Sequence, residues 1–519
     1  MALIIENGAR DWRNYHGSVA HRVQQLAETR FDTPPGTMTE TLGAMGRALA
    51  QLLGRARVRG ETVNAIGSGW SFTDLVAGTD VLLGLRVGDG GPCSDQGLVW
   101  PVAPGQCRIA EPERLAMVWG GTRIGQLNRA LAARGRSLRT SGSHDGQTLA
   151  GAIGTGVHGG AHAQGGIQNH VRGLHIVAGP GRSWWLERRS DPVIADGLAV
   201  QLGARLLRDD RLFDAALVHL GGMGLINAVL IDTVPLFICD VLAALAPITP
   251  DWLALLAAGD WCALARAAGH DDDPYFMEVT IDPAEPFRQP AMHTLYFNRA
   301  DDPGCGCALD DLLLNDPLNG LGQAPPAEKL AAATPAPAPA LGPDIDVAAL
   351  LRAQFKPARP GERWGTWGEL NGPHQPLAPL YNAAFAVPRA RVAEAVQAAL
   401  AAVAGLPRHF VFTLRAVDGA AGTLAFTRFA ETVVINLDGL GTSLSPVGPM
   451  AAAAVRAALE GAGIPYGLHW GKLGGIDAAK VAADFGPARG AWRSARHRLL
   501  GPAMRQIITN PALAAWGLD

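Results

Sequence analysis

Two glycine-rich stretches in the N-terminal half constrain this chain more than any other feature. Thr62–Gly69 reads TVNAIGSG, which indicates a short apolar strand that ends in a Gly-Ser-Gly turn. Ser141–Gly166 is the densest glycine tract of the chain and follows far downstream. Small residues let backbone N–H groups approach and surround an anion. Two such loops, too far apart for one nucleotide-binding turn, favour a long dinucleotide, with one loop at its pyrophosphate and the other against a ring system.

Simpler explanations of these glycines stay open at this level. A Gly-Ser-Gly turn is common by itself, and an unusually glycine-rich surface loop would account for the second tract. The turn at Gly67 does not continue into GxGxxG with an acidic residue on the next strand, nor into GxxxxGK[ST]. A nicotinamide site or a P-loop therefore loses its main support.

Charge and hydropathy exclude several classes of protein. The 44 basic and 47 acidic residues give a net charge of −3, which predicts no bulk attraction to nucleic acid or to an anionic membrane. No stretch of about 20 uninterrupted apolar residues occurs, which argues against a membrane span. The start, MALIIENGARDWRNYHG, places charges where a signal peptide needs an apolar run, so we expect a cytoplasmic protein.

The cysteines and lysines are both sparse. Six scattered cysteines, with Cys305 and Cys307 as one close pair without a second, predict free thiols and neither a disulfide framework nor a zinc site. Only four lysines occur, so a lysine inside a motif stands out: Lys329, Lys356, Lys472 and Lys480.

Composition divides the chain into three predicted parts. Residues 1–237 are glycine-rich, residues 238–460 mix Ala-rich helical patterns with strands, and residues 461–519 form a C-terminal segment. Within the middle part, 322–344 is nearly pure Ala and Pro, which predicts a mobile loop. Hydrophobic periodicity predicts helices at Arg123–Arg134, Arg391–Val403 and Ala451–Leu459, and strands at Leu174–Ala178, Ala228–Val234, Tyr275–Ile281, Phe410–Val417 and Glu431–Leu437.

Five motifs occur in a recognisable order, namely Trp12-Arg13-Asn14, Val63–Asp74 (VNAIGSGWSFTD), Val118–Gly135, Ser141–Gly160 and His219–Pro235. Together they resemble the FAD-binding, PCMH-type domain of the vanillyl-alcohol oxidase/p-cresol methylhydroxylase superfamily. Gly467–Leu473 is similar to the HWGK signature of one branch, the aldonolactone and alditol oxidases. The resemblance covers most of residues 10–235 and returns around 385–475, whereas residues 240–370 match no motif.

The resemblance implies an α+β fold. A PCMH-type FAD-binding domain of two subdomains would precede a cap domain, whose antiparallel sheet covers the flavin, and the C-terminal segment would return to the site. It implies that Gly67, Ser68, Gly69 and Ser71 bind the FAD pyrophosphate, in agreement with the backbone argument above. The other residues implied to bind FAD are Ile66, Trp70, Ser141, Gly142, Ser143, His144, Gln147, Thr148, Gly151, Gly154, Thr155, His158, Gly224, Ile226 and Lys472.

One departure from the family concerns how FAD is attached. Oxidases of this branch carry a histidine in GSGHS that bonds to the flavin, and the matching residue here is Trp70. The indole N–H only donates hydrogen bonds and is no nucleophile. The second attachment found in bicovalent relatives needs a cysteine in the glycine tract, and Ser141–Gly166 contains none. We therefore expect non-covalent FAD, with Trp70 near the dimethylbenzene edge.

A second departure concerns the substrate. The family has a Glu-x-Arg pair on a cap strand, and the strand here keeps Arg415 but has Thr413 in place of the acid. Threonine cannot act as a general base near neutral pH. Histidine titrates in the useful range, so the replacement candidates are His144, His374 and His469. The resemblance assigns His158 to the flavin scaffold instead.

The predicted catalytic residues are Arg415, Lys472 and His469, with Lys472 stabilising negative charge on the reduced flavin. The predicted function is FAD-dependent oxidation of a C–H bond, most simply at CH–OH, of a small molecule, with oxygen or another electron acceptor as the second substrate. Two alternatives stay open: a flavin-dependent dehydrogenase or cyclase of a bulkier secondary metabolite, and a redox protein that binds FAD without turnover. Neither nucleic acid nor membrane is an expected partner.

Overall fold

The computed structural model describes residues 2–31, 36–76, 78–86, 94–299, 309, 312–318, 345–372 and 379–519. The Ala/Pro-rich segment 322–344, the Cys305–Cys307 pair and His374 lie outside these ranges. Within them, Cys107, Cys239 and Cys262 form no disulfide. The described helices include none that is both long and apolar enough to traverse a bilayer, and no described side chains cluster as a metal site would require.

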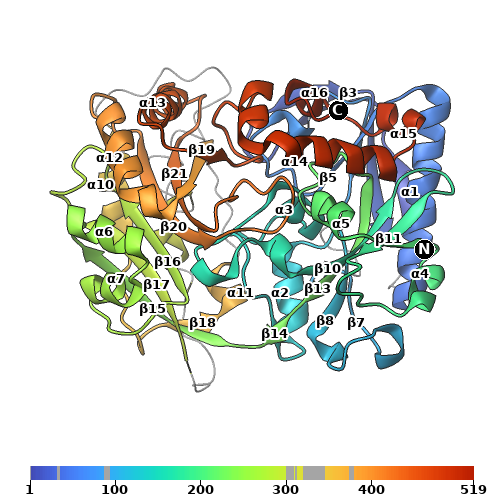
Figure 1. The fold of residues 1–519 in the computed structure, drawn as a ribbon, viewed down its shortest axis with the longest axis horizontal. Helices are drawn as coiled ribbons and strands as arrows, with labels where there is room; N and C mark the ends of the chain where they lie inside the picture. The colour runs from blue at the N-terminus through green and yellow to red at the C-terminus, as the bar shows by residue number, and fades with distance from the viewer. Residues whose placement is uncertain are drawn as a thin grey trace.

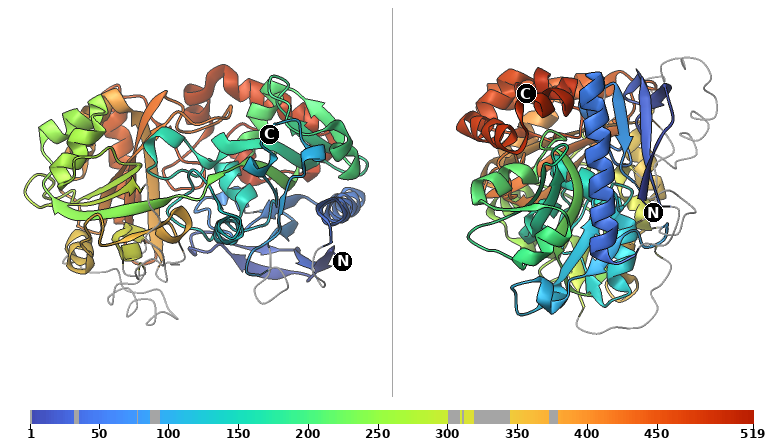
Figure 2. Two further views of the ribbon diagram at one scale, coloured as in Figure 1. Left: turned by 90° about the horizontal axis from the view of Figure 1, so that it is seen from below. Right: turned by 90° about the vertical axis from the view of Figure 1, so that its right-hand side faces the viewer.

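The N-terminal half begins with a four-stranded sheet, in the order β1-β4-β6-β5, and the long helix α1 (Met38–Arg59). Thr37 and Glu40 cap each other's backbone at the start of α1, and Gly60 ends it in a left-handed conformation. The apolar face of α1 packs between this sheet and the next one (Figure 2). The strands are β1 (Ala2–Glu6), β4 (Gln25–Phe31), β5 (Val63–Ile66) and β6 (Val81–Gly84), and β2 (Arg10–Arg13) and β3 (Ala20–Val23) form a separate hairpin.

A six-stranded sheet, in the order β12-β11-β10-β13-β8-β7, completes the N-terminal half. Two of the predicted strands are its central members, β10 (Val171–Val177) and β13 (Leu225–Asp232), and both begin earlier than predicted. Every residue of β13 is buried, which is typical of a strand covered on both faces. The other strands are β7 (Val99–Pro101), β8 (Leu115–Trp119), β11 (Ser183–Glu187) and β12 (Arg205–Arg208), and the helices are α2 (Ile124–Ala132), α3 (Leu149–Thr155), α4 (Asp196–Gln201) and α5 (Asp210–Leu217).

An eight-stranded antiparallel sheet forms the other half, in the order β18-β15-β17-β16-β20-β21-β19-β22 (Figure 1). Helices cover its outer face through one apolar core, and its inner face joins the core of the N-terminal half. The predicted antiparallel cap sheet is therefore present. Its strands are β15 (Ile238–Ala246), β16 (Phe276–Ile281), β17 (Ala291–Asn298), β18 (Trp364–Thr366), β19 (Leu380–Pro388), β20 (Phe410–Asp418), β21 (Glu431–Leu440) and β22 (Gly467–Leu468), and the covering helices are α6 (Pro250–Ala258), α7 (Trp261–Ala268), α12 (Val392–Val403) and α13 (Val447–Gly461).

Short elements connect the two halves. Trp367 on α11 (Trp367–Leu370) is fully buried and donates from its indole N–H to the hydroxyl of Ser141, 3.0 Å away, so it ties the cap half to the glycine tract. The remaining short elements are β9 (Arg136–Ser137), which pairs with β14 (Val234–Pro235), and α10 (Val347–Gln354).

The C-terminal segment serves both halves. Its first strand, β22, is the edge of the eight-stranded sheet, whereas α14 (Ala478–Leu499), α15 (Pro502–Ile507) and α16 (Pro511–Ala515) pack on the N-terminal half (Figure 1). Helix α14 is kinked at Gly486, which precedes Pro487. The predicted boundary at residue 461 therefore matches a change in composition, whereas the packing divides the C-terminal segment between the two halves.

Arg496 on α14 holds this segment in place and provides a stability test. Its buried guanidinium donates to the carbonyl oxygens of Gly222, Arg505 and Ile508 at 2.9–3.1 Å. Because Arg496→Leu leaves these buried acceptors without donors, we expect the free energy of unfolding to fall by about 3 kcal/mol or more. Arg498→Leu, which removes a half-exposed partner of Asp209 on the same helix, should cost at most about 1 kcal/mol. Urea denaturation of both variants measures the difference, and equal losses would contradict it.

Candidate functional site

A cavity lies where three distant segments meet: the turn after β5, the glycine tract around α3, and the loop after β22. Two hydrogen bonds join the turn after β5 to the loop after β22. Phe72 N–H donates to the carbonyl of Gly471 at 2.8 Å, and the Thr73 hydroxyl donates to the carbonyl of Trp470 at 2.9 Å. The inner face of the eight-stranded sheet closes the cavity on the remaining side through Arg415. Both halves of the molecule therefore contribute walls.

The two glycine-rich loops touch each other. A Cβ at Gly67 would lie 1.9 Å from the Thr148 hydroxyl, and one at Gly154 would lie 2.5 Å from the His219 ring, so only glycine fits at either position. Three polar side-chain atoms at these loops are buried and have no hydrogen-bond partner in the described protein: Ser68 Oγ, Ser143 Oγ and Gln147 Oε1. Buried polar groups rarely stay unpaired, so these atoms indicate a polar ligand against both loops.

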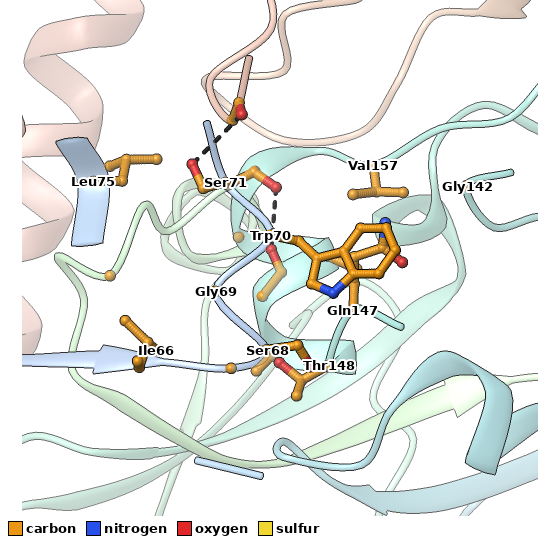
Figure 3. A pocket seen from close by; sticks show the side chains of 18 of the residues that line it. Ile66, Ser68, Gly69, Trp70, Ser71, Leu75, Gly142, Gln147, Thr148 and Val157 are labelled. Carbon is orange, nitrogen blue, oxygen red and sulfur yellow. Dashed lines mark hydrogen bonds between the residues drawn. The ribbon is translucent and has the colours of Figure 1, made fainter. Parts of the chain in front are cut away.

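Trp70 points its indole into the cavity beside Gln147 (Figure 3). A Cβ on Gly146 would fall 2.5 Å from the indole, so the ring lies flat against the glycine tract. Its other neighbours are Tyr15, stacked at 4.5 Å between ring centroids, and His144, at 5.4 Å. The indole thus fills the position at which a covalently bonded histidine is expected in the family.

A charged cluster occupies the cap side of the cavity. Glu278 on β16 lies directly opposite Arg415 on β20 in the sheet register, and Arg415 Nε donates to Glu278 Oε2 at 2.6 Å. A second carboxylate, Asp316, accepts from Arg415 Nη2 at 3.0 Å. Burial opposes the charge on Arg415, but the two carboxylates outweigh it and raise the pKa of the guanidinium. Burial raises the pKa of Glu278 to about 7, against the pull of Arg415.

Lys472 reaches the same end of the cavity from the loop after β22. Its ammonium donates to Asn436 Oδ1 on β21 at 2.7 Å. Burial lowers the pKa of Lys472 to about 8, although Asp438 on the same strand favours the charged form. Burial also raises the pKa of Asp438, which accepts a hydrogen bond from the Asn382 amide. Two cations therefore face three carboxylates here.

The predicted histidines are brought to this site with different environments. His469 is buried on Phe426, its Nδ1 accepts from the Gly471 N–H at 3.0 Å, and burial lowers its pKa well below the ordinary value. His158 stands 6.0 Å from it between ring centroids, and burial lowers its pKa to about 3. His144 Nε2 lies 3.8 Å from Asp316. Both His469 and His158 are therefore weak proton acceptors at neutral pH.

All but one of the residues predicted to bind FAD or act in catalysis line this one cavity, although their roles stay predictions. The exception is Ser141, which is buried behind it with Trp367. Sequence reasoning missed Glu278, Asp316, Asp438 and Asn436. For Glu278 the missing information is the sheet register, because it lies 137 positions from Arg415 in the chain. Its position inside a predicted strand was the only signal.

Comparison with known proteins points to a cofactor. Residues 47–187 match the family model described as "FAD binding domain". An L-gulono-1,4-lactone dehydrogenase of Mycobacterium tuberculosis is 30% identical over 193 residues, which are 36% of this chain and 36% of that protein. A D-arabinono-1,4-lactone oxidase of Eremothecium gossypii is 30% identical over 183 residues, which are 35% of this chain and 29% of that protein. The match spans about a third of the length of these curated relatives.

Solved structures are similar over nearly the whole chain. Cholesterol oxidase from B. sterolicum superimposes with a TM-score of 0.65 at 14% identity, covering 99% of this chain and 97% of that one. A solvent-stable cholesterol oxidase gives a TM-score of 0.63 at 16% identity, covering 99% and 98%. These likenesses confirm the predicted α+β fold. FAD is the cofactor, and the unpaired polar atoms of both glycine-rich loops fit it.

Gly67→Ala tests whether the contact between the loops forms the FAD site. The added methyl group would overlap the Thr148 side chain, so the two loops must separate. Such overpacking costs about 1 kcal/mol or more, and if that cost weakens FAD binding, the affinity should fall by a factor of about ten or more. Gly197→Ala, at a helical position with open space around its Cβ, should bind FAD like the parent. Titration of apoprotein with FAD, followed by quenching of flavin fluorescence, gives both affinities. Unchanged affinity for Gly67→Ala would mean that FAD binds elsewhere.

Proposed function

We propose that this protein is an FAD-dependent oxidoreductase that removes a hydride from an alcohol carbon (CH–OH) of a small organic substrate, with FAD bound non-covalently. The observation that carries the proposal is that Arg415 and Lys472 line one end of a cavity whose other walls are the FAD-binding loops, with Glu278 buried directly behind Arg415. A protein that only stored FAD would have no need for a cluster of opposing charges there. Oxygen or another electron acceptor would take the electrons in the second half of the cycle.

The residues that would hold FAD are those of the two glycine-rich loops. Gly67, Ser68 and Ser71 offer backbone and hydroxyl donors to the pyrophosphate, and Ser143 and Gln147 offer unpaired polar atoms further along the cavity. Gly224 and Ile226 line the part of the cavity assigned to the adenosine. When bound, FAD supplies a two-electron acceptor for hydride. Everything else in the reaction falls to side chains of this chain.

Glu278 is the proposed proton acceptor, in place of the acid that Thr413 has replaced. Its pKa of about 7 leaves a substantial fraction ionised near neutral pH, which suits a general base. Arg415 holds Oε2, so the carboxylate has a fixed orientation. Glu278 lies behind Arg415 and does not itself line the cavity, so the hydroxyl proton would reach it through a water molecule beside Arg415 as the C–H bond breaks. Thr413 pairs instead with Thr280 on the neighbouring strand, 3.3 Å between hydroxyl oxygens, and supports the sheet.

Arg415 and Lys472 are the proposed electrostatic groups. Arg415 orients Glu278 and faces the cavity, where it can donate to a substrate oxygen. Lys472 would stabilise the negative charge that builds up during hydride transfer, because a fixed cation in an enclosed site acts strongly on developing charge. Burial lowers the pKa of His469, so its ring would be neutral and would form part of the cavity wall rather than transfer a proton.

The names of the similar proteins support the substrate class. The curated relatives are named for lactones of sugar acids and the similar structures for cholesterol, which differ in size and polarity but share a CH–OH group. We propose the CH–OH carbon as the common target.

Non-covalent attachment gives a direct prediction. Because Trp70 has replaced the nucleophile and lies between Gly146 and Tyr15, acid precipitation should release all yellow colour into the supernatant. The denatured polypeptide should have the mass of its sequence without a flavin adduct. Flavin fluorescence that stays with the protein band on a denaturing gel would contradict the prediction.

Glu278→Gln tests the proposed function itself. Anaerobic stopped-flow with aldonolactones, alditols and sterols as candidate substrates should show flavin bleaching in the parent, and the variant should be slower by about a hundredfold or more. Below pH 7 the parent should slow because Glu278 is protonated, and above pH 8 because Lys472 loses its charge, so the profile is bell-shaped. Glu278→Gln should remove the acid limb, and Lys472→Met the alkaline one.

A matched control is Glu187→Gln, since Glu187 is also a fully buried strand residue paired with an arginine, Arg208. Unlike Arg415, the partner of Glu278, none of the described hydrogen-bond partners of Glu187 lines the cavity. The Glu187→Gln variant should keep both limbs of the profile. An acid limb that survives in Glu278→Gln would assign the base to another group, and the absence of bleaching by any alcohol would favour a protein that binds FAD without turnover.

A further inference from the structure

The indole of Trp70 lines the cavity and also stacks on a second aromatic ring, which reaches the surface. The Tyr15 ring lies parallel to the indole, with 4.5 Å between centroids and 9° between planes. Trp70 lines the FAD cavity, and Tyr15, in the turn of the β2–β3 hairpin, is only half-buried. His16 stands edge-on to both rings and stacks on Phe72 at 3.8 Å. The pair therefore forms a continuous π-contact from the cavity wall to the exterior.

The hairpin turn is fixed to the FAD-binding loop, so the stacking is not a loose surface contact. Tyr15 N–H donates to the carbonyl of Gly69 at 2.8 Å. The Asn14 amide donates to the carbonyl of Ser71 at 2.7 Å, and the Ser18 hydroxyl donates to the carbonyl of Phe72 at 3.0 Å. These bonds hold the ring pair in one geometry.

The pair lies at the redox end of the cavity and not at its adenosine end. The indole contacts His144, His144 lies 3.8 Å from Asp316, and Asp316 accepts from Arg415 at 3.0 Å. Trp70 is therefore separated from the charged cluster that handles the substrate by only two side chains. A flavin ring placed to receive hydride beside Arg415 has Trp70 as its neighbour.

We propose that Trp70 and Tyr15 form the exit through which electrons leave the reduced flavin for a small anionic one-electron acceptor at the β2–β3 hairpin. The inference rests on the proposed function, which loads the flavin with two electrons. Two acceptor molecules each take one electron, the flavin proton passes to solvent, and the rings shorten the gap that the electron crosses without being oxidised themselves. Electron transfer weakens steeply with distance and is favoured by π-contact, which the stacked pair supplies.

The charge of the hairpin indicates the sign of the acceptor. Its exposed charged side chains are Arg10, Arg13, Arg22 and Asp11, and Arg22 pairs with Asp11 at 3.2 Å. The exposed Asp74 acts on His21 of the hairpin, so three arginines stand against two carboxylates and the hairpin keeps a small net positive charge, although the whole chain is slightly acidic. A positive patch attracts an anionic partner and repels a cationic one, and salt screens both effects.

The test needs no knowledge of the natural substrate. The flavin of the holoprotein is reduced by illumination with EDTA, then mixed anaerobically with ferricyanide, or separately with oxygen, in a stopped-flow instrument. Tyr15→Leu should lose most of the ferricyanide rate and keep the oxygen rate, because oxygen reaches the flavin directly. Trp12→Leu is the matched control: Trp12 packs on Gly69 from the same hairpin but does not line the cavity, so both rates should stay. Added salt should slow ferricyanide and not a cationic ferrocenium acceptor.

The emission lifetime of the bound flavin gives a readout apart from turnover. A tryptophan in contact with an excited flavin quenches it by donating an electron, so Trp70→Leu should lengthen the lifetime and Trp12→Leu should not. An unchanged lifetime in Trp70→Leu, or an unchanged ferricyanide rate in Tyr15→Leu, would overturn the proposed exit. If Trp70→Leu released FAD, Tyr15→Leu would decide alone. Reduction by light but by no alcohol would instead count against the proposed function.

Discussion

The contact between Gly67 and Thr148 is the constraint on which the architecture of the site depends. It brings the turn after β5 against the start of α3 so closely that no side chain fits between them. Helix α1 packs between the two sheets of the N-terminal half, and this loop contact joins them at the cavity. Both loops need small residues for backbone approach, and the glycine content of the N-terminal half follows from that need.

The second organising principle is the neutralisation of charge on the inner face of the eight-stranded sheet. Arg415 and Lys472 are enclosed, and such cations are stable only with partners. Glu278, Asp316 and Asp438 supply them from two strands and one loop. Burial raises the pKa of Glu278 and lowers that of Lys472, so both move toward neutral pH. The oppositely charged neighbours, Arg415 and Asp438, limit these two shifts and keep the charged forms accessible.

The sequence predicted most of the cavity but not the proposed proton acceptor, for a physical reason. Glycine loops and the HWGK segment are local patterns, so Gly67, Thr148 and Lys472 could be found by reading along the chain. Glu278 lies beside Arg415 only because β16 pairs with β20 in one register, and an antiparallel pairing over such a distance leaves no local pattern. Likewise the loss of the acid at Thr413 was visible, whereas its replacement on the adjacent strand was not. Tyr15 was missed because stacking is a tertiary contact.

The path of residues 467–518 through both halves bears on how the protein matures. Gly471 and Lys472 line the cavity, and the helices that follow them pack against α1 and α5. These parts are synthesised after the glycine loops and after most strands of the sheets. A nascent chain can thus assemble its glycine loops early, yet it cannot close the cavity until residues 467–518 have left the ribosome. Capture of FAD is therefore expected to follow the synthesis of this segment and to lock the two halves together.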